Sequence, residues 1–597
     1  MELVRSMALG KKPEGMLIRA GLCALLGVLQ GWAVAWPFGV EAVSWSGWSV
    51  TSVWWPEAGR PFPLLQLGVM AGWLWMVVRM PTMRGAVTAG WLFGTGWLMG
   101  VFWWLYVSMH THGGLSSVVA ALAVWALAAT LAAYVATVSG IFWRVSLLSN
   151  GFSAIYFGAV WTLSEWARGT WLTGFPWGAV GYTHVDSLGW LAPWMGVYGM
   201  SGVAAGLAAW LAMRWAQGAW CAATATLSVV ALCAAGPYLE TWAPEWTDST
   251  GPTQVVLLQG NIAQDEKFDT LTGVEQALDW YGPKLWGQNK PNVQSDHDAW
   301  PAGALVVAPE TAVPLLPQTI EMTRWKGWLS ALAAGQHAAV TGLPLGTAAE
   351  GYSNSVWALT PQSAHVALNA LAQGQLPHEW PQTEIDGPSA THSASTVYRY
   401  DKHHLVPFGE FVPPFFRWFV DLMRIPLGDF NRGLLGQPPF EWAGQRFAPN
   451  ICYEDLFGEE LAQSFASAST APTVLVNVSN LAWFGNTVAL DQHLHISRLR
   501  AKELARPMVR ATNTGATVVV NHHGEVVLAA PRLERAVLQG AVEGRAGLTP
   551  FAWWASRWGQ WPVVALALTL VAWGAWKHRR LRRARARTLQ QARAAPA

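Results

Sequence analysis

Long apolar stretches alternate with short polar segments over roughly the first 240 residues of the chain. Seven of these stretches have about the length that a helix needs to cross a hydrocarbon core of about 30 Å, and an eighth lies near the C-terminal end. The pattern predicts a multi-span helical membrane domain over residues 1–240 and a further transmembrane helix over residues 561–577. The predicted spans are Met16–Trp36, Phe62–Val78, Ala86–Val107, Leu115–Phe142, Phe152–Trp166, Gly189–Met213, Gly218–Tyr238 and Pro562–Trp576.

Residues 248–549 have the pattern of a globular domain in which short extended segments are interspersed with helices, which predicts a layered α/β architecture. Two helical patterns cover Tyr453–Phe465 and Asp491–Ala505. Residues 361–395 are rich in Ala, Gln, Pro, His and Ser, and we expect them to form an exposed insertion. The predicted strands are Gln254–Asn261, Ala304–Val307, Thr396–Tyr400, Arg446–Ile451, Thr473–Ser479, Val518–Asn521 and Glu525–Leu528.

Composition strengthens the membrane assignment. The 597 residues are 52% hydrophobic and only 12% charged, against roughly 25% charged in a soluble protein. Tryptophan, which gathers at membrane interfaces, occurs 41 times. A formal net charge of +2 gives no overall attraction to nucleic acid, so we expect no nucleic-acid partner.

The positive charges predict the orientation, because cytoplasmic loops of membrane proteins are enriched in Lys and Arg. With the N-terminus inside, most basic residues between spans fall on the cytoplasmic side, as does the basic tail over residues 578–597. Arg60 and Arg168 are exceptions on the outer side. The globular domain is then extracytoplasmic, which is the periplasm in a Gram-negative cell. The inner basic residues are Arg79, Arg84, Arg144, Arg214 and the Arg-rich segment Lys577–Arg587.

Cys452 is the one cysteine outside the apolar stretches that contain Cys23, Cys221 and Cys233. It lies where a predicted strand gives way to a predicted helix. Unpaired N–H groups and the positive end of the dipole at a helix start lower a thiol pKa, so we expect a stabilised thiolate. Such a residue is either an inert buried cysteine or a nucleophile.

Two further polar residues follow predicted strands, Glu310 and Lys402. Strand ends are where α/β domains assemble active sites. A carboxylate can take the thiol proton and later activate an incoming nucleophile. An ammonium, together with the Tyr453 backbone N–H, can stabilise the oxyanion of a tetrahedral intermediate. Taken together, the three residues predict acyl transfer through a thioester, although a Glu or Lys after a strand is usually only solvated.

Around these residues the sequence resembles the nitrilase superfamily, and nearly the whole chain resembles its membrane-bound branch, the apolipoprotein N-acyltransferase family. The resemblance implies an αββα sandwich with Glu310 as general base, Lys402 as oxyanion stabiliser and Cys452 as nucleophile. Glu410, Tyr453 and Glu454 match supporting positions of the family's site. The matching motifs are Thr173–Trp177, Leu258–Asn261, Lys402–Pro413, Ile451–Glu454, Ser479–Gly485 and Lys502–Thr514.

The resemblance also implies a two-step reaction in a bacterial inner membrane. An acyl chain passes from a phospholipid to Cys452, and then to the α-amine of the lipidated N-terminal cysteine of an apolipoprotein. Neither a metal nor a cofactor is implied. The family usually has other residues where Ala308, Thr311, Phe268 and Leu481 stand, which puts the acyl-chain pocket and loop conformations in doubt but not the three main residues.

Four residues are candidates for substrate binding. Arg168, in the outer loop Glu165–Trp177, could hold a lipid phosphate, although the loop could equally be an interfacial anchor. Phe268 stands where the family usually has Trp. Trp483 and Phe484, with the aromatic stretch Phe408–Phe419, are suited to lids that reach the membrane surface; the alternative is plain domain core.

Two other functions remain open at this point. A membrane-tethered amidase would use water as the acyl acceptor, but tethering needs one span rather than eight. A transporter with an outer accessory domain would need charged residues at mid-depth in its spans, where this sequence has almost none.

Overall fold

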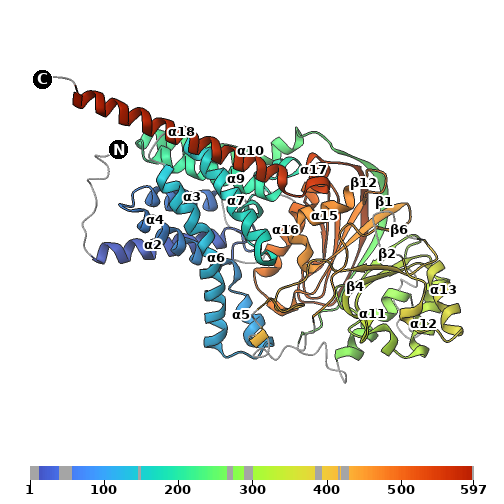
Figure 1. The fold of residues 1–597 in the computed structure, drawn as a ribbon. Helices are drawn as coiled ribbons and strands as arrows, with labels where there is room; N and C mark the ends of the chain where they lie inside the picture. The colour runs from blue at the N-terminus through green and yellow to red at the C-terminus, as the bar shows by residue number, and fades with distance from the viewer. Residues whose placement is uncertain are drawn as a thin grey trace.

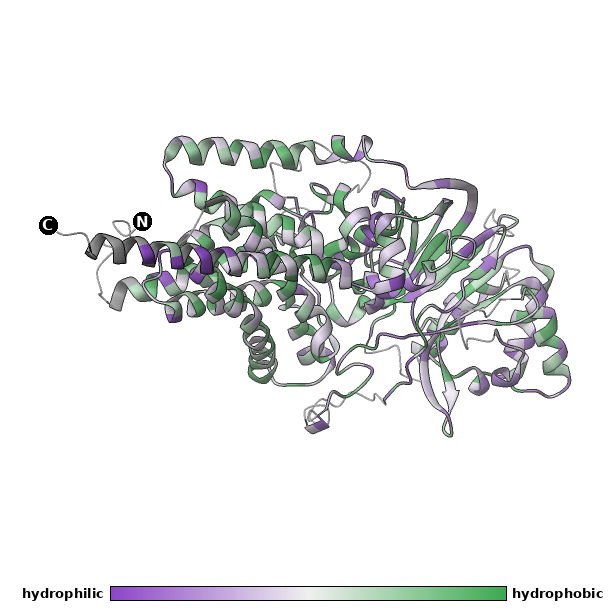
Figure 2. Cartoon of the chain, turned by 45° about the horizontal axis from the view of Figure 1, so that its top comes forward, coloured by the Kyte–Doolittle hydropathy of each residue, from purple (hydrophilic) through white to green (hydrophobic). Residues whose placement is uncertain are grey.

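The computed structural model describes residues 13–38, 57–145, 150–264, 273–287, 300–383, 393–414, 417–418 and 429–594. A bundle of helices forms one half of the molecule, and two β-sheets flanked by helices form the other (Figure 1). Helix α18 (Trp561–Ala594) returns from the sheets and runs along the bundle. Hydrophobic residues dominate the bundle, whereas hydrophilic residues gather in the sheet-containing half and in the distal part of α18 (Figure 2).

Each of the eight predicted apolar stretches coincides with a helix. Among the described residues, four helices are long and apolar enough to cross a membrane, and a fifth such unit is the pair α17 (Pro550–Trp558) and α18, bent by 90°. That all eight cross a membrane stays a prediction, as do the domain boundaries. The helices of the bundle are α2 (Pro13–Trp32), α3 (Pro63–Val77), α4 (Met83–Phe102), α5 (Leu105–Val107), α6 (Ser117–Val145), α7 (Asn150–Thr170), α8 (Val180–Thr183), α9 (Ala192–Trp215) and α10 (Ala219–Thr241).

Glycines let α2 and α4 approach each other closely. A Cβ added at Gly27 would lie 2.1 Å from the Phe93 carbonyl oxygen, and one at Gly96 would lie 2.2 Å from that of Ala24. Small residues at such crossings are typical of helices that associate in a membrane, where van der Waals packing rather than water exclusion holds them together.

The sheet-containing half has two six-stranded sheets, in the orders β12-β1-β2-β3-β4-β5 and β11-β10-β9-β8-β7-β6. Each sheet has parallel pairs in its middle, β1-β2-β3 in one and β7-β8-β9 in the other. The strands are β1 (Thr247–Gln259), β2 (Leu305–Val307), β3 (Ala338–Thr347), β4 (Gly351–Leu359), β5 (Tyr398–Asp401), β6 (Phe440–Trp442), β7 (Gln445–Ile451), β8 (Val474–Ser479), β9 (Met508–Thr512), β10 (Val518–Val520), β11 (Val526–Ala529) and β12 (Ala536–Gly547).

The two sheets pack face to face between two helical layers, so the predicted αββα sandwich is confirmed. Alternation along β1 shows why: Val255 and Leu257 point between the sheets, whereas Val256 and Leu258 point toward the outer helices. Helices α11 (Gly273–Trp286), α12 (Met322–Ala334) and α13 (Pro361–Ala372) cover the outer face of the first sheet. Helix α16 (Ala489–Leu504) and α17 cover the second sheet on the side of the bundle.

Two local predictions were wrong. Residues 361–395 are not simply an exposed insertion, because α13 within them buries Ala364, Ala367 and Leu371 against the first sheet. The predicted helix Tyr453–Phe465 is instead three short pieces: the 3₁₀ helices η7 (Cys452–Leu456) and η8 (Ala462–Phe465), and α15 (Gly458–Leu461) between them.

Helix α16 joins the two halves of the molecule. All of its residues are buried. Leu494 packs into the core under the second sheet, whereas Ile496 and Leu499 pack into the core of the helix bundle. Tyr453 and Phe457 of the sandwich enter the bundle core as well. The sandwich therefore rests on the bundle through a continuous apolar interface.

Candidate active site

Three strand ends bring the predicted catalytic residues together. Glu310 follows β2, Lys402 follows β5, and Cys452 follows β7. The Lys402 Nζ lies 3.5 Å from Glu310 Oε1 and 2.8 Å from Oε1 of Glu410. The thiol of Cys452 is close enough to Glu310 and Lys402 for both charges to act on its ionisation. All three residues and Glu410 thus form one polar cluster at the carboxyl ends of β2, β5 and β7.

Burial differs within this cluster. Lys402 is fully buried, and Glu310 and Glu410 are each 8% exposed. Cys452 is only partly buried. The charged groups are therefore held in a fixed, poorly hydrated setting, and Cys452 as a whole residue is less enclosed than they are.

The pKa of Cys452 is raised, not lowered as its place before a helix predicted. Burial is the largest cause, and the Glu310 carboxylate adds to it; the Lys402 ammonium acts in the opposite direction. The helix that starts at Cys452 is a 3₁₀ segment, η7, with too few peptide units to contribute a large dipole. The resting thiol is therefore protonated and needs a base, and Glu310 is the carboxylate in position.

Lys402 stays positively charged in this site. Burial alone would lower its pKa, but the carboxylates of Glu410 and Glu310 outweigh burial and raise the pKa above the ordinary lysine value. A buried ammonium flanked by two carboxylates is a fixed positive charge, which is what an oxyanion site requires.

Two asparagines, neither of which was given a role from the sequence, position Glu310. Asn354, on β4, donates from Nδ2 to Glu310 Oε1 at 2.8 Å and to Glu410 Oε1 at 2.6 Å. The Asn480 backbone N–H donates to Glu310 Oε2 at 2.9 Å. Both oxygens of Glu310 are thereby held, which fixes the orientation of the carboxylate.

Glu454 ties the strand ends of Lys402 and Cys452 together. Its Oε2 accepts from the Ile451 N–H at 2.7 Å and from the Tyr400 hydroxyl at 2.9 Å, and its Oε1 accepts from the His403 N–H at 2.7 Å. Burial raises the pKa of Glu454 to about 7, against the lowering effect of these hydrogen bonds and of Lys402. Glu454, predicted as a supporting residue, thus fixes the strand end that carries Cys452.

The backbone at Cys452 is in the left-handed region, with φ of 50°. A non-glycine residue pays a steric penalty there, of about 1–2 kcal/mol, and holds the conformation only where neighbours enforce it. The turn directs the chain abruptly from β7 into η7, so that the thiol projects from the strand end.

A loop from the membrane helices lies directly against this turn. It is the segment Thr173–Trp177, between α7 and α8. The Tyr453 hydroxyl donates to the Gly174 carbonyl at 3.1 Å, and the Tyr453 ring stacks on Phe175 with centroids 6.2 Å apart. His404 Nε2 lies 3.1 Å from the Thr173 carbonyl oxygen. Tyr453, the residue after Cys452, is therefore in direct contact with the bundle.

Arg168 holds the Thr173–Trp177 loop through its guanidinium group. It is 2% exposed, and its Nη1 donates to the carbonyls of Phe175 at 2.6 Å and Trp177 at 2.9 Å. Its buried Nη2 has no hydrogen-bond partner among the described residues. That Arg168 binds a lipid headgroup stays a prediction. Its Nη1 is already occupied by hydrogen bonds to the loop carbonyls.

The predicted aromatic lids also contact the bundle. The ring centroids of Phe484 and Trp104 are 4.4 Å apart, and those of Trp483 and His112 are 5.7 Å apart in an edge-to-face arrangement. Phe408 packs against Leu115 at the start of the predicted span Leu115–Phe142. The binding roles of Trp483 and Phe484 stay predictions, and Phe268 lies outside the described residues.

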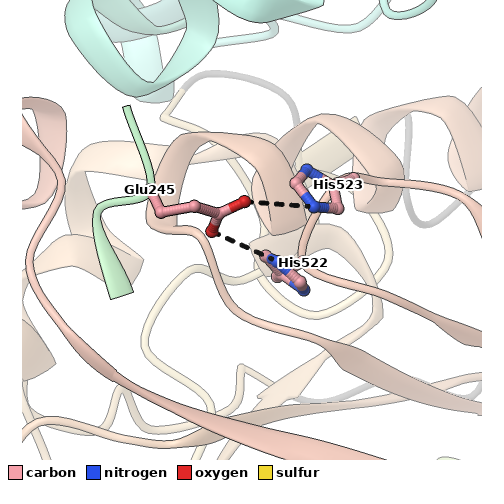
Figure 3. A group of neighbouring side chains, drawn as sticks. All are labelled: Glu245, His522 and His523. Carbon is pink, nitrogen blue, oxygen red and sulfur yellow. Dashed lines mark ion pairs between the residues drawn. The ribbon is translucent and has the colours of Figure 1, made fainter. Parts of the chain in front are cut away.

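One group elsewhere has the ligand types of a metal site. Glu245 points toward both His522 and His523 (Figure 3), with an oxygen 3.8 Å from a ring nitrogen of each. Arg545 Nη2 lies 3.0 Å from the same carboxylate. Burial, and then the charges of His523 and Arg545, lower the pKa of His522 to about 3. Because the carboxylate already has a cationic partner, the group fits an ion-pair cluster better than a cation site.

Two family models match the chain, one in each half. A family model described as the apolipoprotein N-acyltransferase N-terminal domain matches residues 46–210, and one described as carbon-nitrogen hydrolase matches residues 304–551. A solved carbon-nitrogen hydrolase from Helicobacter pylori G27 aligns with 53% of this chain and 94% of its own, at 15% identity and a TM-score of 0.29.

Three relatives match most of the chain. An apolipoprotein N-acyltransferase of Verminephrobacter eiseniae is 46% identical over 558 residues, which cover 89% of this chain and 95% of that protein. One of Ralstonia nicotianae is 41% identical, with 89% of each chain covered. One of Bordetella bronchiseptica is 40% identical, with 83% of this chain and 88% of that protein covered.

Proposed function

Because the chain belongs to the apolipoprotein N-acyltransferase family, we propose that it moves an acyl chain from a phospholipid to an apolipoprotein through a thioester on Cys452. The acceptor is the α-amine of the diacylglyceryl-modified N-terminal cysteine. The observation that carries this proposal is the contact of Tyr453, the residue after the nucleophile, with the Thr173–Trp177 loop of the bundle. A site seated on membrane helices is placed for substrates that stay in the bilayer.

In the first step Glu310 takes the proton of the Cys452 thiol, and the sulfur attacks the ester carbonyl of the phospholipid. The oxyanion that forms is stabilised by the Lys402 ammonium and the Tyr453 N–H. When the carbon–oxygen bond breaks, the leaving alkoxide takes the proton from Glu310. The products are a thioester and a lysophospholipid.

In the second step the α-amine of the lipoprotein attacks the thioester carbonyl. Glu310 takes a proton from the amine, the same two donors stabilise the oxyanion, and the carbon–sulfur bond breaks. The proton returns to the Cys452 sulfur. The products are an amide and the free enzyme, so the cycle consumes no other reactant. Glu410 and Glu454 act by holding Lys402 and the strand ends.

The contacts of α16 support a periplasmic site in the bacterial inner membrane. Three of the loops predicted to lie outside touch this helix: Gly59 contacts His495, Trp177 contacts Gln492, Asp186 contacts Arg498, and Glu240 contacts Lys502. Trp104, near the outer end of the predicted span Ala86–Val107, also contacts Gln492. The predicted inner loops contribute none of these contacts. The acyl donor and the lipoprotein acceptor would then reach the site from the outer leaflet of that membrane.

The half-reactions can be tested separately with the purified full-length protein. Incubated with labelled phospholipid alone, the wild type should accumulate label that neutral hydroxylamine removes, as a thioester does. Cys452→Ala should accumulate none. Lys402→Ala and Glu310→Gln should acylate about 10²–10³ times more slowly, the cost of losing one such group. Transfer of the label to a diacylated lipopeptide distinguishes the acyltransferase from an amidase that uses water.

Matched controls come from the other thiols. Cys23→Ala, Cys221→Ala and Cys233→Ala should label as the wild type does, because these cysteines lie in the bundle helices α2 and α10. Hydroxylamine-labile label on Cys452→Ala would show that another residue is the nucleophile, and the mechanism would be abandoned.

A further inference from the structure

His493 lies beneath the nucleophile and is not used by the mechanism above. It belongs to α16 and is fully buried. Its Nε2 lies 3.1 Å from the carbonyl oxygen of Cys452, and its ring stacks on that of Trp177 with centroids 5.5 Å apart at 20°. A buried imidazole therefore touches the nucleophile's backbone on one side and the membrane-helix loop on another.

Arg510 determines which ring nitrogen of His493 carries the proton. Its Nη2 lies 2.6 Å from His493 Nδ1. A guanidinium can only donate, so Nδ1 must be an acceptor and the proton of the neutral ring sits on Nε2. Burial and the Arg510 charge lower the pKa of His493 well below its ordinary value, so the ring is neutral. Nε2–H then donates to the Cys452 carbonyl.

Arg510 is itself fixed. Its Nε donates to the Ala516 carbonyl at 3.1 Å, and its Nη1 pairs with Asp455 at 3.3 Å and with the Ser497 hydroxyl. These partners come from η7, α16 and the turn after β9, so the guanidinium is locked among three elements. The position of the His493 donor is determined by rigid neighbours rather than by His493 alone.

The Cys452 carbonyl belongs to the same peptide unit as the Tyr453 N–H. The unit is planar and trans, so its C=O and N–H point in opposite directions. Fixing the carbonyl on His493 therefore fixes the direction of the N–H. That N–H is in the first turn of η7, where it has no partner within the helix.

Resting on the proposed function, we propose that His493 is a positioning residue that orients the Tyr453 N–H toward the oxyanion of the acyl-transfer intermediates. It does so by holding the Cys452 carbonyl, in a turn whose φ of 50° would otherwise relax. Because His493 also stacks on Trp177, the oxyanion donor is aligned only when the sandwich is seated on the bundle.

The test compares two reactions of the same thiol in the full-length protein. Acylation by labelled phospholipid passes through an oxyanion, whereas alkylation by iodoacetamide is a displacement at a saturated carbon and forms none. His493→Leu removes the donor. It should slow acylation about 10–10²-fold, at or below the cost of losing one oxyanion donor, and leave the alkylation rate unchanged. His493→Gln can accept from Arg510 and still donate to the carbonyl, so it should recover most of the acylation rate.

His495→Leu is the matched control. His495 lies two residues along α16, is equally buried, and also contacts a backbone carbonyl, that of Gly59 at 2.7 Å, which is remote from the nucleophile. Its ratio of acylation to alkylation should equal that of the wild type, even if its thermal stability falls.

Three results would overturn the inference. One is normal acylation in His493→Leu, and another is a parallel fall of acylation and alkylation, which would indicate general misfolding of the site. The third is failure of His493→Gln to recover acylation. If the wild type itself forms no hydroxylamine-labile intermediate, the proposed function fails and takes this inference with it, which is a distinguishable outcome.

Discussion

At the scale of single residues, the site brings two carboxylates to one ammonium. Glu310 and Glu410 both approach Lys402, and Asn354 donates to the same Oε1 atoms that face the Nζ. Without that amide the two carboxylates would lose the one side-chain donor, besides the lysine, that binds both of their Oε1 atoms. Hydrogen bonds to charged groups contribute about 1.5–3 kcal/mol each, so Asn354 is a substantial part of the arrangement.

Replacing Asn354 with Leu should therefore slow the acylation of Cys452 about 10–100-fold, the rate equivalent of one such hydrogen bond. The rate of hydroxylamine-labile labelling measures this. Ser353→Ala is the control, because Ser353 is the neighbouring buried residue of β4 and its hydroxyl bonds to Asp401 instead. Equal effects of the two substitutions would mean that the strand, not the amide, is what matters.

The raised pKa of Cys452 predicts the pH dependence of its alkylation. Burial and the Glu310 carboxylate hold the thiol protonated, so the thiolate fraction at neutral pH is below that of a free cysteine, whose pKa is about 8.5. The rate of reaction with iodoacetamide should keep rising through pH 9. In Glu310→Gln the like charge is removed, and the same curve should move to lower pH. A plateau below pH 7 in the wild type would contradict the protonated resting state.

At the scale of elements, α16 supplies a hydrogen-bond acceptor to the interrupted helix α9. Gly196 breaks α9 with φ of 62°, and the Val197 N–H freed there donates to Glu503 Oε1 at 2.7 Å. Arg500, fully buried, lies 2.9 Å from the other oxygen of Glu503. A break in one helix is thus capped by a carboxylate of another.

Gly458 leaves the room for this pair. A Cβ added there would lie 1.9 Å from Arg500 Nη1 and 2.6 Å from Glu503. Gly458→Ala should destabilise the protein by about 1–3 kcal/mol, as overpacking in a tight core does, and lower the temperature of thermal inactivation. Gly68→Ala, with nothing within 4 Å of the added Cβ, should leave that temperature unchanged. An unaffected Gly458→Ala would show that the Arg500–Glu503 pair shifts freely.

The sequence was enough to predict the elements whose signals are local. Glu310, Lys402 and Cys452 each follow a short apolar strand, and the bundle helices are marked by their length and apolarity. Strands β3, β4, β6, β9 and β12 were not predicted from the sequence. In β4, Ser353, Asn354 and Ser355 interrupt the apolar residues, so the role of Asn354 was missed as well. The polar side chains of β4 are satisfied by residues distant in sequence, such as Asp401, which no local pattern reveals.

Helix α16 was predicted, but its burial was not. The sequence assigned no partners to Arg498 and Lys502, which pair with Asp186 and Glu240 of the bundle. The role of His493 was missed for the same reason, because its partners Cys452 and Arg510 are distant in sequence and belong to two other elements. Long-range pairing of polar groups is what sequence patterns with periods of 2 or 3.6 residues cannot register.

At the scale of the whole molecule, the positive charges and the contacts of α16 lead to the same topology. Reporter fusions after Asn150 and after Ala597 should report the cytoplasm, and one at Ser395, an exposed residue of the sandwich half, should report the outside. Activity of a periplasm-dependent reporter at each position is the measurement. A cytoplasmic signal at Ser395 would reverse the orientation and remove the lipoprotein substrate from reach.

The burial of α16 on every side has a consequence for how this protein can be divided. A fragment limited to residues 248–549 would expose Ile496, Leu499 and Phe457 to water, each costing about 1.5–3 kcal/mol to hydrate. It would also strand Arg498 and Lys502 without their carboxylates. The sandwich, separated from the bundle, would thus be an amphiphile in its own right because of the outward face of that one helix.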